Sequence, residues 1–221
     1  MAEKGICVYA GSGGELARDV EVALDKLALS YREVNARDVR SGGLDRCSVL
    51  IVPGGQTALC VAALGVRGFE RIREFVTDGG GYVGICAGAY IAARRVEVPG
   101  RPQGLDIIEI KNVRSAGTEV RTIFVTQPDH PIVEGYGRGA VTAPLQIWYQ
   151  NGPLIEAGEG VETLAVYEDG SAAVVCSTYG EGRVVIFSPH PEGSLEGGVD
   201  AQEHGTLRLL GNAVAFASGE R

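Results

Sequence analysis

A cysteine between two glycines has the surroundings that best suit nucleophilic chemistry in this sequence. Cys86 stands in Gly84-Ile85-Cys86-Ala87-Gly88, directly after an apolar strand-like run and before a short helical stretch at residues 87–94. This is the pattern of a sharp strand-to-helix turn that presents a nucleophile at its tip. The glycines avoid clashes with neighbouring backbone, and the N–H groups at the start of the helix favour a thiolate. The pattern predicts that Cys86 is a catalytic nucleophile.

A thiolate that cleaves an amide also needs an acid, because the departing nitrogen must be protonated. His190 stands in Ser188-Pro189-His190-Pro191-Glu192, after another apolar run. Each proline forces the residue before it out of the α region, so this segment should be extended. Residues i and i+2 of an extended segment project to the same side, which brings Glu192 beside His190. We therefore expect a triad of Cys86, His190 and Glu192, in which Glu192 orients the imidazole.

Two backbone N–H groups are candidates for an oxyanion hole. One belongs to Ala87, at the start of the helix that follows the nucleophile. The other belongs to Gly55, in Pro53-Gly54-Gly55 at the end of a separate apolar run, where the missing Cβ lets the backbone approach a ligand. A third glycine-rich turn, at residues 11–14, lacks the spacing of a nucleotide-binding loop. We interpret it as a strand–helix turn at the rim of the site.

The elements that must position these residues alternate strand and helix over the first half of the chain. Apolar runs at residues 5–10, 31–35, 47–52 and 81–85 predict strands, and periodic apolar residues at 16–27 and 68–77 predict helices. This rhythm predicts an α/β fold with a doubly wound, mostly parallel sheet. Functional sites in such folds lie at the carboxyl ends of the strands, which is where Gly55 and Cys86 fall.

The second half of the chain is rich in short β-like segments separated by Gly, Asp and Pro. Residues 106–110, 122–126, 163–167, 172–177 and 183–188 predict strands, several of them pairing as an antiparallel extension of the sheet. Residues 201–217 predict a closing helix. No polar linker or shift in composition interrupts the sequence, so we expect one domain over residues 1–221.

Composition excludes several classes of function. The net charge of −8 argues against nucleic acid as a partner. No apolar run approaches the roughly 18 residues that span a bilayer, and no signal-peptide pattern is evident, so we expect no membrane segment and a cytoplasmic location. The cysteines lack metal-ligand spacing, and we expect neither a metal nor a cofactor. Outside Cys86, the cysteines at positions 7, 47, 60 and 176 are interpreted as small buried hydrophobic residues.

The two motifs together resemble the class I glutamine amidotransferase-like superfamily, in which a cysteine turn after a central strand is combined with a late His-Pro-Glu, here His190-Pro191-Glu192. Within it, the chain is more similar to the domain at the amino end of eukaryotic biotin–protein ligases. Three stretches carry that likeness: residues 52–55, residues 71–76 with 84–90, and residues 148–153. The resemblance implies a flavodoxin-like fold and amide cleavage through a thioester. It also implies substrate contacts from Gly54, Tyr90, Gln150 and Asn151.

One position departs from the glutamine amidotransferases, in which a glutamine four residues after the nucleophile helps to hold the substrate. Tyr90 stands there in this sequence, and a phenol cannot reproduce the donor and acceptor of a carboxamide. The resemblance therefore does not assign free glutamine as the substrate. The chain also has no synthetase domain and nothing that matches the catalytic domain of the ligase. An enzyme that receives ammonia from it would be a separate chain, and self-association is possible in this type of fold.

Three functions remain open. The first is a cysteine-dependent amidohydrolase that cleaves a small carboxamide. The second is a catalytically silent ligand-binding or regulatory module of the same fold. The third is an intracellular cysteine peptidase that acts on a short peptide.

Overall fold

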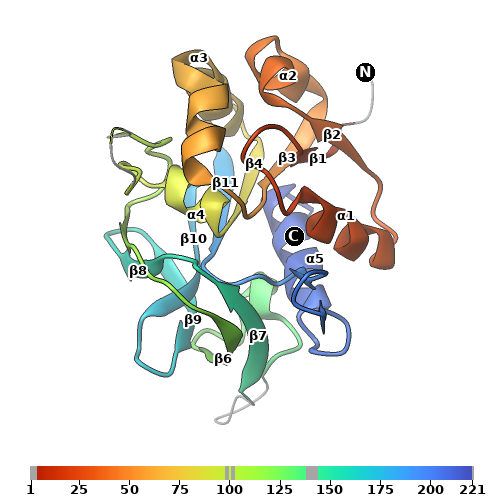
Figure 1. Ribbon diagram of the computed structural model, residues 1–221, viewed down its shortest axis with the longest axis vertical. Coiled ribbons are helices and arrows are strands. Elements are labelled where there is room, and N and C mark those ends of the chain that lie inside the picture. The colour runs from red at the N-terminus through yellow and green to blue at the C-terminus, as the bar shows by residue number, and fades with distance from the viewer. Residues whose placement is uncertain (1–3, 98–99, 101–102, 138–143, 221) are drawn as a thin grey trace.

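The computed structural model describes residues 4–97, 100, 103–137 and 144–220. Within these residues the chain forms an α/β fold around one eleven-stranded sheet (Figure 1). The strand order is β2-β1-β3-β4-β11-β10-β9-β6-β7, and β8 pairs with β10 and β5. The first five strands of this order run parallel and the others pair antiparallel. The predicted parallel sheet with an antiparallel extension is therefore confirmed.

The parallel half follows the predicted alternation of strands and helices. Its elements are β1 (Gly5–Tyr9), α1 (Ala17–Lys26), β2 (Tyr31–Val34), α2 (Ala36–Arg40), the 3₁₀ helix η1 (Gly43–Arg46), β3 (Cys47–Val52), α3 (Thr57–Thr77), β4 (Gly81–Ile85) and α4 (Ala87–Ala92). Helix α3 is longer than predicted because it continues through a kink at Gly65, whose φ of 59° and ψ of −172° are not helical. A glycine adopts this conformation without a steric penalty, so the helix bends at Gly65 and extends back to Thr57.

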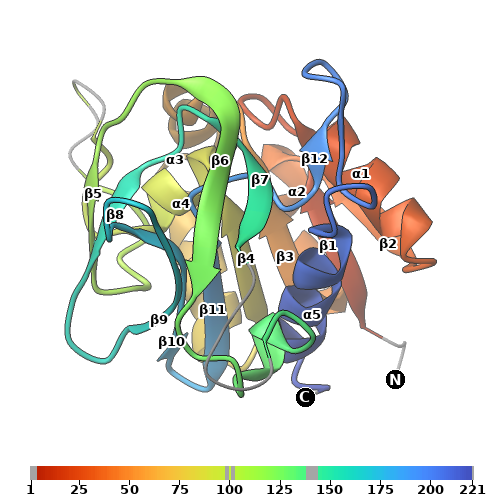
Figure 2. The ribbon, with the colours of Figure 1, turned by 90° about the horizontal axis from the view of Figure 1, so that it is seen from below.

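The second half supplies the antiparallel strands and the last helix. Its elements are β5 (Ile110–Val113), β6 (Thr118–Val125), the 3₁₀ helix η2 (Pro131–Val133), β7 (Leu145–Gln150), β8 (Leu154–Ala157), β9 (Glu162–Tyr167), β10 (Ala172–Tyr179), β11 (Gly182–Phe187), β12 (Gly193–Ser194), β13 (Val199–Asp200) and α5 (Leu207–Ala217). Figure 2 shows β5, β8 and β9 on the opposite side of the molecule from β1 and β2, whereas β12 lies beside α1.

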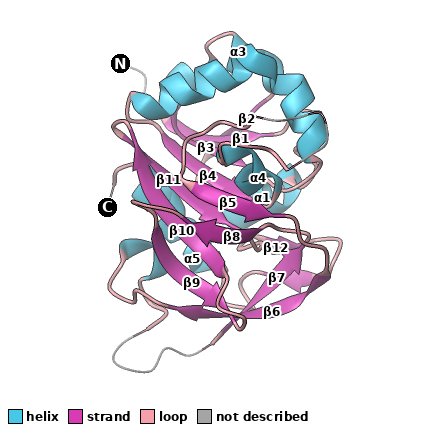
Figure 3. Cartoon of the chain, turned by 90° about the vertical axis from the view of Figure 1, so that its left-hand side faces the viewer, coloured by secondary structure: helices cyan, strands magenta, loops and turns pink. Residues whose placement is uncertain are grey.

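Helices cover both faces of the sheet and bury two hydrophobic clusters. Helices α1 and α5 pack on one face over Val8, Val49 and Val185, and α2, α3 and α4 pack on the other over Leu50 and Tyr82. Figure 3 shows α3 above the sheet, with α5 behind it. No helix among the described residues is long and apolar enough to cross a bilayer.

Three sequence predictions need correction. The strand expected at residues 106–110 starts only at Ile110, and the segment before it instead caps α4: the N–H groups of Leu105 and Ile107 donate to Ile91 and Ala92 carbonyls at 2.6 and 3.1 Å. The last helix begins at Leu207 rather than at residue 201. Cys7 and Cys47 are buried as predicted, but they form a disulfide between the adjacent strands β1 and β3.

Candidate active site

Cys86 lies at the tip of the turn between β4 and α4. Its φ of 50° and ψ of −99° are strained for a residue that carries a Cβ. A Cβ on Gly84 would lie 2.7 Å from the Gly88 carbonyl oxygen, and a Cβ on Gly88 would lie 2.1 Å from that of Val52. Neither position can hold a side chain without moving the backbone. The two glycines are therefore what allows the turn to be this tight.

His190 reaches this turn because its strand is the parallel neighbour of β4. Phe187 of β11 pairs with Ile85 of β4, and the Cys86 N–H donates to the Phe187 carbonyl at 3.0 Å. Beyond the strand, the His190 N–H donates to the Trp148 carbonyl of β7 at 2.8 Å. His190 is thus held between β4 and β7 by a single bridge to Trp148.

Glu192 holds the imidazole of His190 from one side. Nδ1 of His190 and Oε1 of Glu192 are 2.8 Å apart, and the two side chains are only 1% and 0% exposed. Since a carboxylate accepts this hydrogen bond, Nδ1 carries a proton. The extended geometry expected over residues 188–192 is wrong beyond His190. The chain turns there, with the Gly193 N–H donating to the His190 carbonyl at 3.2 Å, and this turn places Glu192 beside the imidazole.

The other side of the imidazole faces the same small space as Cys86. A Cβ on Gly54 would lie 2.7 Å from Cε1 of His190 and 3.5 Å from Cβ of Cys86, so Gly54 leaves room for both. Nε2 of His190 is buried and makes no hydrogen bond of ordinary geometry within the described part of the chain. Catalytic hydrogen bonds are often loose in the absence of substrate and tighten when it binds.

The pKa of His190 is set by competing effects. Burial on its own lowers the pKa of an imidazole, but the Glu192 carboxylate and the Cys86 thiol act in the opposite direction. Together they raise the pKa of His190 well above its ordinary value. The site therefore favours a charged imidazolium between a carboxylate and a sulfur.

The two backbone N–H groups predicted to form an oxyanion hole belong to Ala87 and Gly55. Neither the Ala87 N–H nor the Gly55 N–H donates a hydrogen bond to another described residue. Gly55 has a φ of +144°, and a Cβ there would lie 2.2 Å from the Gly13 carbonyl oxygen of the turn at residues 11–14. That turn packs against Gly55 and so fixes the direction of its N–H.

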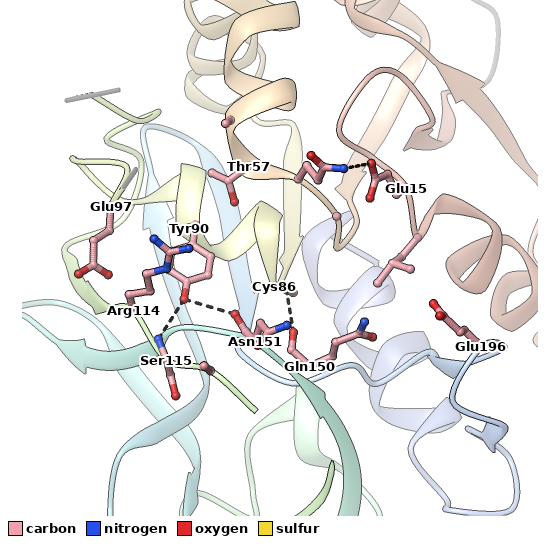
Figure 4. Close-up of a pocket in the computed structure, with 15 residues that line it drawn as sticks. Glu15, Thr57, Cys86, Tyr90, Glu97, Arg114, Ser115, Gln150, Asn151 and Glu196 are labelled. Carbon is pink, nitrogen blue, oxygen red and sulfur yellow. Dashed lines mark hydrogen bonds between the residues drawn. The ribbon is translucent and has the colours of Figure 1, made fainter. Parts of the chain in front are cut away.

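A cavity of about 670 Å³ opens beside Cys86, a size that suits a small ligand (Figure 4). One side carries Tyr90, Glu97 and Arg114, and the other carries Glu15 and Glu196. The remaining lining residues are Leu16, Gly55, Gln56, Thr57, Ala58, Ser115, Ala116, Gln150 and Asn151. Cys86 is only 6% exposed, but its exposed edge faces this cavity.

Tyr90, Gln150 and Asn151 form a wall of this cavity, and the hydroxyl of Tyr90 and the side-chain oxygens of Gln150 and Asn151 already have hydrogen-bond partners. The Tyr90 hydroxyl donates to the Asn151 carbonyl at 3.3 Å and accepts from the Ser115 N–H at 3.4 Å. The Asn151 side-chain oxygen accepts from the Gly117 N–H at 3.0 Å, and that of Gln150 from the Trp148 indole at 3.3 Å. Burial raises the pKa of Tyr90 to about 12, so the phenol stays neutral.

Four charged residues of the cavity were not found from the sequence. Glu15, Glu97, Arg114 and Glu196 come from four separate loops, and none stands in a motif. Only the assembled fold brings them to one rim. Glu15 accepts a hydrogen bond from the Gln56 side chain at 2.5 Å, whereas Arg114 and Glu97 form no ion pair with any described residue.

One cluster away from this cavity has metal-ligand residue types. His130, Glu162 and Cys176 offer ligand atoms within 4.8 Å of one another. However, Nδ1 of His130 accepts from the Ile132 N–H at 3.2 Å, which puts the proton of the neutral ring on Nε2, 3.6 Å from the Cys176 sulfur. Burial also raises the pKa of Cys176 to about 12. A protonated Nε2 and a protonated thiol favour a hydrogen bond here rather than a bound metal.

Comparison with protein families matches the first half of the chain. The family described as "Biotin-protein ligase, N terminal" matches residues 8–115, a range that includes Gly54, Gly55, Cys86 and Tyr90. His190 and Glu192 lie outside the matched range.

Relatives with curated names cover more of the chain. The pyridoxal 5'-phosphate synthase subunit PdxT of Nocardioides sp. is 35% identical over 159 residues, which is 69% of this chain and 74% of that protein. The subunit of the same name from Haloquadratum walsbyi is 30% identical over 194 residues, 87% of each chain.

Solved structures share the fold at lower identity. A glutamine amidotransferase aligns with a TM-score of 0.67 at 24% identity, covering 97% of this chain and 98% of its own. PurLQS from Thermotoga maritima aligns with a TM-score of 0.70 at 17% identity, covering 97% and 99%. A β-galactosidase from Bacillus circulans also contains the fold, in 31% of its length, with a TM-score of 0.62 at 16% identity. The fold therefore does not decide the chemistry.

Proposed function

Because this chain belongs to the class I glutamine amidotransferase-like superfamily, we propose that it is a cysteine-dependent amidohydrolase that releases ammonia from a small carboxamide. The observation that carries the proposal is that Cys86 lines the cavity and shares the space at Gly54 with the buried imidazole of His190, which Glu192 holds at 2.8 Å. A cysteine in a strained turn next to a charged imidazole fits nucleophilic attack better than a structural role.

In this proposal each group has one task. The Cys86 thiolate attacks the amide carbon, and the N–H groups of Gly55 and Ala87 bind the oxygen as it becomes negative. His190 gives its proton to the leaving nitrogen, which departs as ammonia and leaves a thioester on the sulfur. Water then attacks the thioester with His190 as base, which releases the acid and restores the Cys86 thiolate and the protonated imidazole. Glu192 orients the imidazole and stabilises its charge throughout.

The charges of the cavity suit an amino-acid amide, and we propose glutamine as the first substrate to test. Arg114 and Glu97 lie on the same side of the cavity as Tyr90 and form no ion pair with other described residues. A guanidinium binds a carboxylate and a carboxylate binds an ammonium, so the pair complements the charged end of such a molecule. Tyr90 then serves as a wall rather than as the amide-holding residue, because its hydroxyl is engaged by backbone.

The relatives bear on partners. PdxT is by its name a subunit of a synthase, and we propose that this chain likewise passes ammonia to a separate synthase chain.

We also propose a cytoplasmic location. Because disulfides are rare in the reducing cytoplasm, the Cys7–Cys47 bond gives a direct test. Mass spectrometry of alkylated thiols from freshly lysed cells should then find Cys7 and Cys47 largely reduced, and a fully oxidised pair would contradict this location.

The decisive experiment measures ammonia release from L-glutamine and a panel of small carboxamides. Cys86→Ala should abolish release while it keeps the melting temperature, and Cys176→Ala, a matched change at another buried free cysteine, should keep release. Release that survives Cys86→Ala would end the proposed mechanism. A wild-type chain that cleaves no carboxamide but is stabilised by glutamine would instead be a ligand-binding module. Cleavage of peptides alone would favour the peptidase.

A further inference from the structure

A second hollow, of about 470 Å³, lies beyond the end of α4 that is remote from Cys86. Its lining includes three arginines, Arg73 of α3 together with Arg94 and Arg95 just after α4. Gln103, Asp106 and Tyr179 complete the polar part of the surface. None of these residues lines the cavity beside Cys86, and the mechanism proposed above uses none of them.

The charge of this hollow is not balanced by its own residues. Asp106 is the only carboxylate among the lining residues, and its Oδ2 lies 4.0 Å from Nε of Arg94, at the outer limit of an ion pair. Arg95 has no ion pair or hydrogen bond with any residue in the described ranges. Three guanidinium groups thus face one carboxylate, in a chain whose net charge is −8. The positive charge is a local feature and does not follow from the composition.

The backbone beneath the arginines is fixed. The Gly104 N–H donates to the Arg94 carbonyl at 2.9 Å, and a Cβ on Gly104 would lie 2.2 Å from the Ala93 carbonyl oxygen. Nη1 of Arg73 donates to the Leu105 carbonyl at 3.4 Å, which ties α3 to the same segment. A fixed backbone lowers the entropy that a ligand would have to offset on binding, because only side chains must be ordered.

We propose that this arginine hollow binds the phosphate group of a small anionic ligand. Guanidinium groups present paired N–H donors that match phosphate oxygens, and they bind phosphate more strongly than a neutral donor does. The Tyr179 hydroxyl and the Gln103 amide add neutral donors at the same rim. The hollow exceeds the volume of a phosphate ion alone, so an organic phosphate monoester should fill it better than free phosphate does. This inference does not rest on the proposed amidohydrolase activity.

The test is titration calorimetry of the whole chain with inorganic phosphate and with glycerol 2-phosphate, at constant ionic strength set by chloride. The double variant Arg94→Gln, Arg95→Gln should weaken binding at least about ten-fold for each guanidinium lost, since each makes a charge-assisted hydrogen bond. The control is Arg37→Gln, Arg46→Gln, which removes the same charge from exposed positions on the α2–η1 side and should leave binding unchanged. If glycerol 2-phosphate binds more tightly than inorganic phosphate, the ligand is an organic phosphate. If the two bind with equal affinity, the ligand is free phosphate.

Three results would overturn the inference. The first is the absence of saturable binding of either probe. The second is an equal loss in the two double variants, which means an adventitious ion only. The third is a loss caused by Arg114→Gln rather than by the hollow's variants, which would put the anion in the cavity beside Cys86. Because Arg94 and Arg95 are exposed, the melting temperature of their variant separates lost binding from lost folding.

Discussion

The charge of Glu192 should control the proton on His190, and the change Glu192→Gln tests this. The amide keeps an oxygen that can accept the hydrogen bond at 2.8 Å, so the geometry should survive. What it removes is the negative charge that raises the pKa of the imidazole. Burial, which lowers the pKa of His190, is then opposed only by the Cys86 thiol. We therefore expect the pKa of His190 to fall sharply in the variant.

The sign of the stability effect follows from the raised pKa. A histidine whose pKa is higher in the folded state than in the unfolded state stabilises the fold fully below the unfolded value of about 6.5. That contribution is lost as the pH rises through the higher folded value. The difference in free energy of unfolding between wild type and Glu192→Gln should therefore be largest in mild acid, below about pH 6.5 but above about pH 4.3, where an ordinary glutamate is still ionised. Above about pH 6.5 it should shrink by about 1.4 kcal/mol per pH unit until His190 loses its proton.

Urea unfolding of both proteins at half-unit pH steps measures this difference, and NMR titration of the imidazole locates the proton directly. The same pair should be compared in a Cys86→Ala background, which removes the thiol that also raises the pKa of His190. The expected result is a difference that narrows with pH in both backgrounds. Parallel stability curves, with a constant offset, would refute the conclusion that Glu192 keeps His190 charged.

Three further changes test the site and its support. Gly88→Ala should lower kcat/KM at least about 100-fold and destabilise the fold by about 1–3 kcal/mol, because the new Cβ would lie 2.1 Å from a carbonyl oxygen of β3. A variant with unchanged kcat/KM and stability would contradict the steric account of the turn. Tyr90→Phe removes the hydrogen bond to the Asn151 carbonyl. Urea unfolding should show a free energy of unfolding lower by about 0.5–1.5 kcal/mol, and kcat should change less than about three-fold. A large fall in kcat would mean that the hydroxyl contacts the substrate. The Cys7–Cys47 disulfide joins residues 40 apart, and its reduction should lower the free energy of unfolding by about 4 kcal/mol on the chain-entropy account. Equal stability of the reduced and oxidised chains would contradict this expectation.

The parallel half of the fold was predictable because its central strands β3 and β4 are buried on both faces. Their apolar runs are nearly continuous, and the observed bounds of β3 and β4 are those expected. Residues 106–110 were misassigned because Ile107 and Ile108 are buried against a helix end rather than within a sheet. A short apolar run has the same appearance in both settings. The disulfide left no signal either, since its pairing depends on β1 and β3 being neighbours.

The candidate site divides in the same way between what local sequence determines and what the assembled fold determines. Cys86 and His190 follow strands that pair directly, so one strand pairing, Phe187 with Ile85, is enough to bring their motifs together. The wall opposite Cys86 has a different origin. Gln150 and Asn151 were expected from the stretch at residues 148–153, whereas Ser115, which follows β5, was not, because its place beside them depends on the pairing of antiparallel strands.

This division has a consequence for substrate choice. The groups proposed to do the chemistry depend on the parallel sheet and on glycines that tolerate no side chain, so they cannot change without loss of the turn. The wall depends on loops held by a few hydrogen bonds, such as that from the Gly117 N–H to the Asn151 side chain. Changes in those loops can reshape the cavity while the thiol and the imidazole stay where they are. Substrate identity should therefore be sought in Arg114, Glu97 and the Tyr90 wall rather than in the catalytic motifs.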